Sequence, residues 1–193
     1  MALGKQAKVL AKGQVEATLG YLAKTRYPER NRVIFLLSSK AGLRAKEIAC
    51  LTWDMITEAT GEIGSAIALR DEASKGSSGR TIPLNTELRS ALIVWRSIQP
   101  KGSLFVISTE RAGRTSAQAI VNLFLRWYDE LGFNGCSSHN GRRTFITAAA
   151  RKISTVGGSL RDVQLLAGHT NLRTTQRYIE ASPEAQARIV QQL

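Results

Sequence analysis

The sequence predicts a mainly α-helical domain that carries one small antiparallel β-hairpin, which is an α+β fold. Two observations support this fold class. Apolar residues recur at helical spacing in several segments of the 193-residue chain, most clearly over residues 116–131. In contrast, residues 61–84 consist of short runs of Ile and small residues joined by a Gly/Ser-rich stretch. No internal repeat, low-complexity tract or linker is visible, so we expect a single domain.

The front of the chain is expected to form three helices and the hairpin. Apolar spacing indicates a helix over residues 13–25, and the run VIFLL indicates a buried helix over residues 30–41. Gly42 ends that helix, and RAKEIACL begins a further short one. The runs GEIGSAIALR and GRTIPL then flank DEASKGSSG, which is typical of two β-strands around a turn.

The middle of the chain is expected to be helical apart from one strand. A helix follows around residues 88–95, and residues 103–108 are apolar and short enough for a strand. The clearest helix covers residues 116–131, where Ile, Leu, Phe and Trp side chains share one face. A loop then separates it from a helix over residues 139–152.

Capping patterns predict the last three helices. Ser159 and Asp162, three residues apart, resemble a capping box at a helix start. Asn171 is placed to cap the helix that is expected to hold Tyr178. The tripeptide SPE, which begins at Ser182, is a strong start signal for a final helix that continues to the last residue.

The charge of the chain indicates a polyanionic partner. Lys plus Arg number 27 and Asp plus Glu number 15, which gives a formal net charge of +12. This balance favours nucleic acid over membrane, because no basic amphipathic helix with aromatic anchors stands out. With two cysteines, no bilayer-length apolar run and no secretory signal, the chain is expected in a reducing cytoplasm. Two histidines and no CxxC pair give no pattern of metal ligands.

Six side chains could carry chemistry together, although each alone has an ordinary explanation. An arginine after a helix break is usually solvated, a lysine in a Gly/Ser turn serves solubility, and a helical tyrosine is usually half-buried. As a set, arginines can hold a phosphate, histidines can move protons, a lysine can protonate a leaving oxygen, and a tyrosine can attack. Such a set suits phosphoryl transfer through a phosphotyrosine without a metal, because the arginines supply the positive charge. The six are Arg44, Lys75, His139, Arg142, His169 and Tyr178.

A series of motifs places these residues in order along the chain: AGLRAKEIACLTWDMI, SKGSSGRTIPL, HNGRRTF and LLAGHTNLRTTQRY. In this order they resemble the motifs of the tyrosine recombinase (phage integrase) family, over about residues 13–180. The resemblance implies the fold of that family's catalytic domain and the six catalytic residues given above, with Tyr178 as the nucleophile. It also implies a supporting role for Glu47, three residues after Arg44.

The resemblance implies a site-specific DNA recombinase or integrase. Its tyrosine would attack a DNA phosphodiester, form a 3′-phosphotyrosyl link and release a 5′-hydroxyl, and a 5′-hydroxyl of a partner strand would then complete strand exchange without ATP or another cofactor. The expected partner is double-stranded DNA, bound by a homo-oligomer that is a tetramer on DNA and a monomer when free, in the prokaryotic nucleoid. Three alternatives stay open: a type IB topoisomerase-like enzyme, a non-catalytic DNA-binding protein with this fold, and a basic RNA-binding module.

The resemblance also bears on domain organisation. We expect residues 1–193 to form one catalytic domain, with residues 1–12 as an N-terminal extension and without the separate N-terminal domain that family members usually carry. Two explanations stay open: a naturally short family member, or a catalytic domain cut from a longer protein. The final helix, within residues 182–193, is expected to dock on a neighbouring protomer. The alternative is that this helix packs on its own domain.

Two departures from the family pattern concern packing. Gly141 and Ala167 each replace a common leucine. The glycine predicts looser packing beneath the neighbouring histidine and arginine of the HNGRRTF motif. Thr174 and Thr175 are interpreted as helix or DNA-backbone contacts and not as catalysts.

Overall fold

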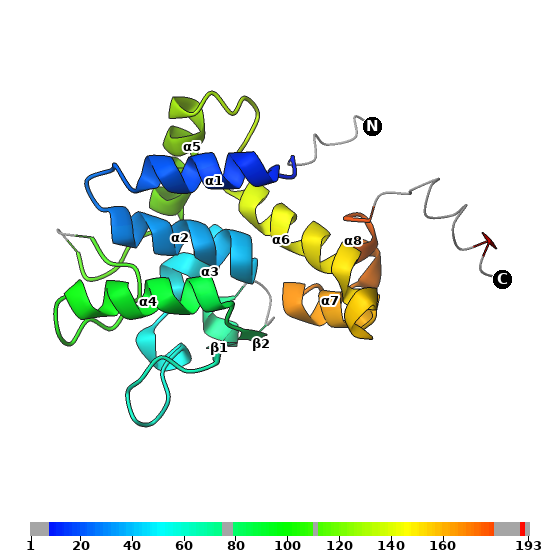
Figure 1. Cartoon of the computed structure of the whole chain (residues 1–193). Coiled ribbons are helices and arrows are strands. Elements are labelled where there is room, and N and C mark those ends of the chain that lie inside the picture. The colour runs from blue at the N-terminus through cyan, green and yellow to red at the C-terminus, as the bar shows by residue number, and fades with distance from the viewer. Residues whose placement is uncertain (1–7, 75–78, 110–111, 180–189, 192–193) are drawn as a thin grey trace.

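The computed structural model describes residues 8–74, 79–109, 112–179 and 190–191, so the predicted final helix lies almost wholly outside the described residues. Within these ranges the chain is mostly helical with a two-stranded antiparallel sheet, and the predicted fold class is confirmed (Figure 1). None of the described helices is long and apolar enough to cross a membrane. The elements in chain order are α1 (Lys12–Leu22), α2 (Pro28–Ala41), α3 (Ala45–Cys50), β1 (Ala66–Leu69), β2 (Arg80–Pro83), α4 (Thr86–Ile98), α5 (Ala117–Glu130), α6 (His139–Lys152), α7 (Leu160–Ala167) and α8 (Leu172–Gln176).

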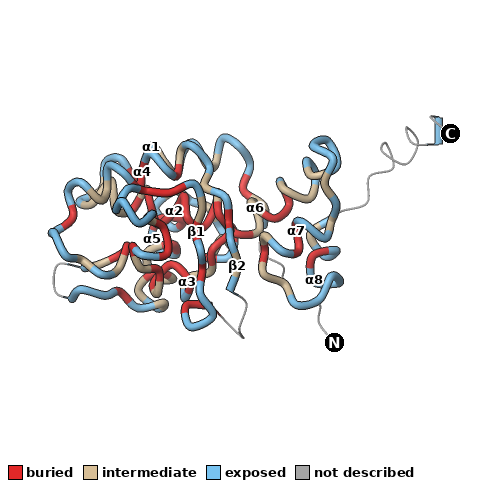
Figure 2. Tube along the Cα trace, turned by 90° about the horizontal axis from the view of Figure 1, so that it is seen from below, coloured by how far each residue is buried: buried red, intermediate tan, exposed pale blue. Residues whose placement is uncertain are grey.

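A helical body around α2 holds most of the buried apolar side chains. Five consecutive residues of α2, Val33–Leu37, have no exposed surface, which accounts for the uninterrupted run VIFLL. The predicted apolar face of α5 packs there: the ring of Phe124 lies 6.4 Å from that of Phe35 and 5.2 Å from that of Trp127. Aromatic pairs at these separations add a favourable contact to the burial of their surface. Figure 2 shows the buried segments gathered where α1 to α5 meet.

The two strands of the predicted hairpin are confirmed. β1 and β2 pair antiparallel, with Ile67 opposite Ile82, and both of these side chains are buried. Arg80 lies two residues before Ile82 in the same strand, so the two side chains share the inward face of the hairpin. The turn, residues 75–78, lies outside the described residues, and Lys75 with it.

α6 runs from the helical body to α7 and α8 (Figure 1). A second, smaller apolar cluster lies there. Ile146 of α6 packs there with Val163 and Ala167 of α7, and all three side chains are buried. Because α6 also packs against α2, it holds the C-terminal helices α7 and α8 at a fixed place beside the body.

The close contact between α2 and α6 corrects the expectation of loose packing at Gly141. A Cβ atom at position 141 would lie 2.5 Å from Ser38 Oγ and 2.9 Å from Ser38 Cβ. Gly42, which ends α2 with a φ of 66°, is covered in the same way, since a Cβ there would lie 2.5 Å from the ring of Phe145. The absence of a side chain at both glycines therefore lets the two helices approach, which brings the end of α2 beside the start of α6.

The two C-terminal helices begin at the predicted caps, but α8 is shorter than expected. The Asp162 carboxylate accepts a hydrogen bond from the Ser159 N–H at 2.7 Å, and Asn171 Oδ1 accepts from the Arg173 N–H at 2.8 Å. The prediction that α8 holds Tyr178 was wrong, because the helix ends two residues earlier. The chain continues there through tighter hydrogen bonds between residues three apart, which turn it back toward α6.

The predicted strand over residues 103–108 does not form. Phe105 makes only an isolated antiparallel bridge with Thr52, flanked by two backbone hydrogen bonds of 3.0 and 2.9 Å. The partner segment turns at once into a short 3₁₀ helix, Trp53–Met55, so its backbone points away and the pairing cannot extend.

Candidate active site

A cleft of about 530 Å³ opens between the start of α3, the first turns of α6 and the residues around α8. Five of the six predicted catalytic residues line it: Arg44, His139, Arg142, His169 and Tyr178. The sixth, Lys75, lies outside the described residues. The other described residues along the cleft are Lys8, Gly135, Ser137, Arg143, Thr174 and Arg177.

Arg142 forms the floor of the cleft. It lies one turn into α6 and is only 4% exposed. Its guanidinium donates to the Gly42 carbonyl and, at 2.6 Å, to the Ala167 carbonyl. These carbonyls end α2 and α7, where the helix dipole favours a positive charge. Burial, and then the charge of Arg44, lowers the pKa of Arg142 to about 10, so it stays positive at neutral pH.

Arg44 is held in place by the supporting residue Glu47. The Glu47 carboxylate accepts from the Arg44 backbone N–H and from Arg44 Nη1, both at 2.8 Å. Glu47 has no exposed surface, whereas the Arg44 side chain keeps 26% exposure, toward the cleft that it lines. The acidic residue of the first motif thus fixes both the backbone and the side chain of its arginine.

Arg80 is a second partner of Glu47, and sequence reasoning missed it. Its Nη1 donates to Glu47 Oε1 at 3.0 Å, and its Nε donates to the Leu166 carbonyl at 2.8 Å, which ties β2 to α7. Burial alone would raise the pKa of Glu47, but the hydrogen bond and charge of Arg80, helped by a second arginine, hold this pKa below its ordinary value. Alternation along β2 was the signal, because Arg80 shares the inward face of Ile82.

His169 lies just after the left-handed cap of α7 at Gly168. Its Nε2 is 3.0 Å from Arg142 Nη2, and its Nδ1 is 2.9 Å from Thr175 Oγ1. Burial, followed by the charges of Arg142 and two further arginines, lowers the pKa of His169 to about 4. The imidazole is therefore neutral at physiological pH.

Thr175 has no exposed surface, which corrects its interpretation as a DNA-backbone contact. Its hydroxyl lies against the His169 ring and not toward solvent. Thr174 differs, because it is exposed and lines the cleft. The sequence could not distinguish the buried threonine from the exposed one, because both belong to the same polar run.

Tyr178 stacks its ring on that of His169, with 5.6 Å between centroids and 27° between planes. Its N–H donates to the Thr175 carbonyl at 3.0 Å, which closes the turn after α8. The Arg143 guanidinium lies 5.2 Å from the centre of the Tyr178 ring, close enough for a cation–π contact. Arg143 follows Arg142 in α6 and is a further residue at the site that sequence reasoning missed.

His139 and Lys8 lie at the rim of the cleft. His139 is the first residue of α6 and is exposed. Lys8 belongs to a strap before α1 that is fastened to α6: Asn140 Nδ2 donates to the Lys8 carbonyl at 2.7 Å, and the Leu10 N–H donates to Thr144 Oγ1 at 2.8 Å. The Lys8 ammonium group donates to the Asn134 carbonyl at 3.0 Å and remains exposed.

The cleft is lined mainly by positive and neutral polar side chains, with the phenol of Tyr178 at its edge. Five of the lining residues are lysine or arginine, and the described lining includes no Asp or Glu. Over the described part of the chain, no three His, Cys, Asp or Glu side chains gather into a possible metal site. Arginines and a neutral imidazole that lie this close together can bind a tetrahedral anion and hold it before a phenol.

Known proteins of similar sequence include tyrosine recombinases. The tyrosine recombinase XerA of Thermococcus kodakarensis is 27% identical over 179 residues, which are 92% of this chain and 59% of that protein. The tyrosine recombinase XerC of Proteus mirabilis is 30% identical over 154 residues, which are 77% of this chain and 47% of that protein. The chain therefore spans about half to three fifths of the length of these relatives.

Solved structures show the same fold. The Tn1549 transposon integrase, in complex with a circular intermediate DNA, superposes with a TM-score of 0.77 at 20% sequence identity. The match covers 99% of this chain and 67% of the integrase chain. The model of the phage integrase family matches residues 8–185, which is nearly the whole sequence. The chain belongs to the phage integrase family.

Proposed function

We propose that this chain is the strand-cleaving and strand-joining part of a site-specific DNA recombinase. The observation that carries the proposal is the meeting of Tyr178 with two buried or half-buried arginines and two histidines in one positively charged cleft. A tyrosine is a poor nucleophile unless the charge that develops in the transition state is stabilised, and this cleft supplies that stabilisation. The resemblance to an integrase that has been solved with DNA supports double-stranded DNA as the substrate.

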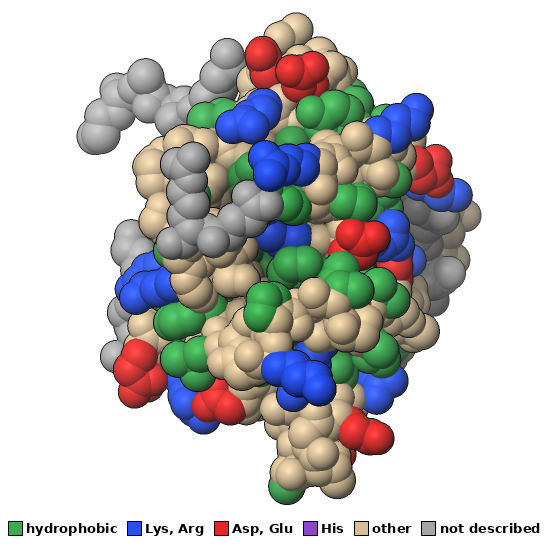
Figure 3. Space-filling view, turned by 90° about the vertical axis from the view of Figure 1, so that its left-hand side faces the viewer, with side chains coloured by type: hydrophobic (Ala, Val, Ile, Leu, Met, Phe, Trp, Pro, Cys, Tyr) green, Lys and Arg blue, Asp and Glu red, His purple; other side chains and the backbone are tan. Residues whose placement is uncertain are grey.

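The distribution of charge supports the same substrate. Figure 3 shows the face that lies at the left of Figure 1, where Lys and Arg side chains are scattered among Asp and Glu side chains. The described lining of the cleft, in contrast, holds cations without carboxylates. A concave surface of one sign focuses the potential and draws in a polyanion, so the excess positive charge of the chain acts where Tyr178 lies.

The proposed first step is the attack of the Tyr178 hydroxyl oxygen on a DNA phosphorus. The O–P bond to tyrosine forms, the bond to the 5′-oxygen breaks, and a 3′-phosphotyrosyl link results. Arg44 and Arg142 bind the non-bridging oxygens, and His169 donates a hydrogen bond to one of them. His139 takes the phenol proton, and Lys75 gives a proton to the leaving 5′-oxygen. Glu47 supports Arg44 and does not touch the phosphate.

The second step reverses the first with a different strand. A 5′-hydroxyl from the partner DNA attacks the phosphotyrosyl phosphorus, and the tyrosine oxygen leaves and recovers its proton. The number of phosphoester bonds is unchanged, so the reaction needs no energy source. This balance distinguishes strand transfer from hydrolysis, in which water would take the place of the hydroxyl.

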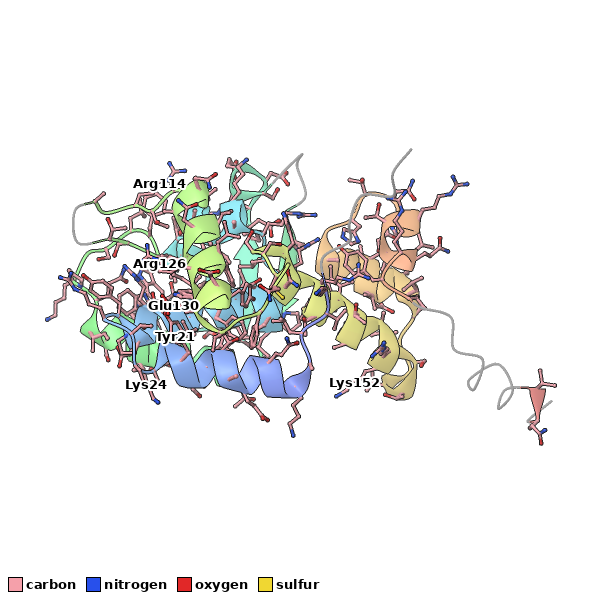
Figure 4. The ribbon with its side chains drawn as sticks, turned by 90° about the horizontal axis from the view of Figure 1, so that it is seen from above. Tyr21, Lys24, Arg114, Arg126, Glu130 and Lys152 are labelled. Carbon is pink, nitrogen blue, oxygen red and sulfur yellow. The ribbon has the colours of Figure 1, made fainter. Side chains whose placement is uncertain are left out.

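Covalent capture tests this function without knowledge of the target sequence. The chain is incubated with a pool of nicked duplexes of randomised sequence, and adducts that survive denaturation are isolated. We expect adducts for the wild-type chain, none for Tyr178→Phe, and adducts for Tyr21→Phe, whose ring lies on α1 away from α7 and α8 (Figure 4). Binding of DNA without an adduct by the wild type would favour a non-catalytic DNA-binding protein.

We further propose that the protein acts as a homo-oligomer, a tetramer on DNA, in the cytoplasm where it meets the prokaryotic nucleoid. Two reciprocal exchanges of strands require four nucleophiles, which is the chemical reason for four protomers. The segment 182–193, almost wholly outside the described residues, is the proposed docking element between protomers. Deletion of this segment should leave a monomer that binds DNA and does not assemble, as measured by light scattering with DNA. Unchanged assembly would contradict this role.

A further inference from the structure

The His169 imidazole is held from both sides within the cleft. Its Nε2 lies 3.0 Å from Arg142 Nη2, and its Nδ1 lies 2.9 Å from Thr175 Oγ1. Its backbone is pinned as well: the His169 N–H donates to the Gln164 carbonyl at 3.1 Å, and Gln164 Nε2 donates to the His169 carbonyl at 2.8 Å. The ring has little freedom to swing, so a change in its hydrogen bonds must come from its protons.

The two ring contacts fix where the proton of the imidazole lies. A guanidinium carries only donors, so Arg142 can bond to Nε2 only if that nitrogen offers a lone pair. The proton of the neutral ring must then be on Nδ1, from which it donates to the Thr175 hydroxyl. Thr175 is fully buried, so its hydroxyl depends on this contact, whereas the His169 ring is only partly buried and can exchange protons with water. The low pKa of His169 agrees with a neutral ring.

This arrangement does not suit the role of His169 in the proposed reaction. Nε2 must carry a proton before it can donate to a phosphate oxygen. The charged neighbours of the ring oppose a second proton on it, because their net charge is positive. They are three arginines, Arg142, Arg44 and Arg80, and one carboxylate, Glu47. Transfer of the single proton from Nδ1 to Nε2 leaves the ring neutral, so it is the easier change.

We propose that Thr175 is a positioning residue that lets His169 reverse its tautomer when a DNA phosphate enters the cleft. Before the phosphate binds, the Thr175 hydroxyl accepts from Nδ1–H. When the phosphate takes the Arg142 guanidinium, Nε2 loses its donor. The Nδ1 proton passes to water, Nε2 takes a proton from water, and the hydroxyl rotates to donate to the bare Nδ1. No net proton is gained, and Nε2–H then points at the phosphate.

A hydroxyl suits this position because it can both donate and accept. A carbonyl or carboxylate would only accept and would hold the proton on Nδ1, whereas an ammonium would only donate. The inference rests on the proposed function, since it assumes that a phosphate occupies the cleft. Its description of the state without DNA depends only on the two contacts of the ring.

Nitrogen NMR measures the tautomer directly. The chain has two histidines, so ¹⁵N-histidine labelling of the His139→Gln variant leaves His169 as the only signal. At pH 7.5 without DNA, we expect the Nδ1 resonance at the shift of a protonated ring nitrogen and the Nε2 resonance at that of an unprotonated one. A proton on Nε2 in this state would overturn the proposal.

Substitution of Thr175 tests the functional half, with the rate of covalent adduct formation as the measurement. Thr175→Val keeps the shape and removes the hydroxyl, so one buried ring nitrogen is unpaired in either tautomer. We expect adduct formation to slow about tenfold or more, the effect of an unsatisfied buried polar group. Thr175→Ser restores the hydroxyl and should recover most of the rate, which a loss of packing alone would not predict.

Thr147→Val is the matched control for the rate of adduct formation. Thr147 is a buried threonine of α6 whose hydroxyl has no hydrogen-bond partner within the described part of the chain. This variant should react at the wild-type rate. If Thr175→Val reacts as fast as Thr147→Val, the proposal is overturned while the proposed function stands. If the wild type forms no adduct, the proposed function fails, and the nitrogen spectrum still decides the tautomer.

Discussion

Glu47 is the residue through which distant parts of the sequence are held together at the cleft. It is fully buried and accepts hydrogen bonds from Arg44 and Arg80, which lie 26% and 6% exposed. A buried carboxylate persists in its charged form only when cations compensate for the loss of water, and these two arginines do so. The same carboxylate offsets the repulsion between the positive charges of Arg44 and Arg80, which lie near Arg142.

Loss of this carboxylate should destabilise the protein more than loss of a surface one. Glu47→Gln leaves two arginines without their counter-charge, and we expect the free energy of unfolding to fall by about 3–5 kcal/mol. The control is Glu87→Gln, because Glu87 pairs with Arg32 and Lys40 while it is 34% exposed. Glu87→Gln should lower the free energy of unfolding by less than about 1 kcal/mol. Urea unfolding followed by circular dichroism measures both, and equal losses would contradict the role of Glu47.

The lowered pKa of His169 predicts that the protein loses stability in mild acid. Its pKa is about 4 in the folded chain, against about 6.5 for an unperturbed histidine, so between these values the unfolded chain binds more protons. Stability from this group is complete above pH 6.5 and is lost as the pH falls toward 4. The lowered pKa of Glu47 acts in the same direction at still lower pH. The melting temperature of His169→Gln should therefore vary less than that of the wild type between pH 6.5 and 4, and parallel curves would contradict this account.

At the level of the helices, the contact between α2 and α6 sets the position of Arg142. Gly141 precedes Arg142 and lies against Ser38, and Gly42, whose carbonyl accepts from Arg142, lies against Phe145. The backbones must approach this closely for the guanidinium to reach across from α6 to the end of α2. Packing without a side chain at position 141 is therefore part of how the site is built.

Added volume at this contact should destabilise the chain even with the smallest side chain. Gly141→Ala places a methyl group 2.5 Å from Ser38 Oγ, and we expect a loss of about 1–3 kcal/mol from overpacking. Gly20→Ala is the control, because nothing lies within 4 Å of a Cβ at that position of α1. It should stabilise the chain by about 0.5–1 kcal/mol through helix propensity. Chemical denaturation should show a lower free energy of unfolding for Gly141→Ala and a higher one for Gly20→Ala. A higher free energy of unfolding in both variants would contradict the close packing.

The elements that could be predicted from sequence are those with local signals. The stripe of α5, the cap at Asn171 and the inward alternation of β1 and β2 depend on residues a few positions apart. The end of α8 and the failed strand at residues 103–108 depend on tertiary contacts, since the Tyr178 ring packs back on His169 and the partner of Phe105 turns away.

Some residues of the candidate site could also be predicted from local sequence motifs, and others could not. The motifs predicted Arg44, His139, Arg142, His169 and Tyr178, and the fold brings these five to one cleft. The residues that hold them take their roles from contacts made across the fold: alternation along β2 could indicate that Arg80 points inward but not that it binds Glu47, and no local signal marks the buried Thr175.

The cleft lies where the helical body meets the unit formed by α6, α7 and α8. Arg80 and Arg142 donate to the last two carbonyls of α7, and Asn140 fastens the strap before α1 to the same unit. The site therefore draws residues from the beginning, the middle and the end of the described chain.

Lys8 should contribute one phosphate contact to DNA binding. Lys8→Met is expected to reduce the slope of log affinity against log salt by about one for a short duplex of mixed sequence. Lys24→Met is the control, because Lys24 lies after α1 on the part of the molecule away from α7 and α8 (Figure 4). Its slope should match that of the wild type. Equal slopes for the two variants, measured by fluorescence anisotropy, would remove Lys8 from the DNA surface.

Peptide mapping determines whether Tyr178 becomes bonded to DNA. Trypsin cuts after Arg177, so Tyr178 begins the peptide YIEASPEAQAR. Adducts captured from the randomised duplex pool are digested with trypsin and nuclease and sequenced by tandem mass spectrometry. We expect a nucleotide remnant on the phenol of Tyr178. A remnant on any other residue, or an adduct that persists in Tyr178→Phe, would contradict it.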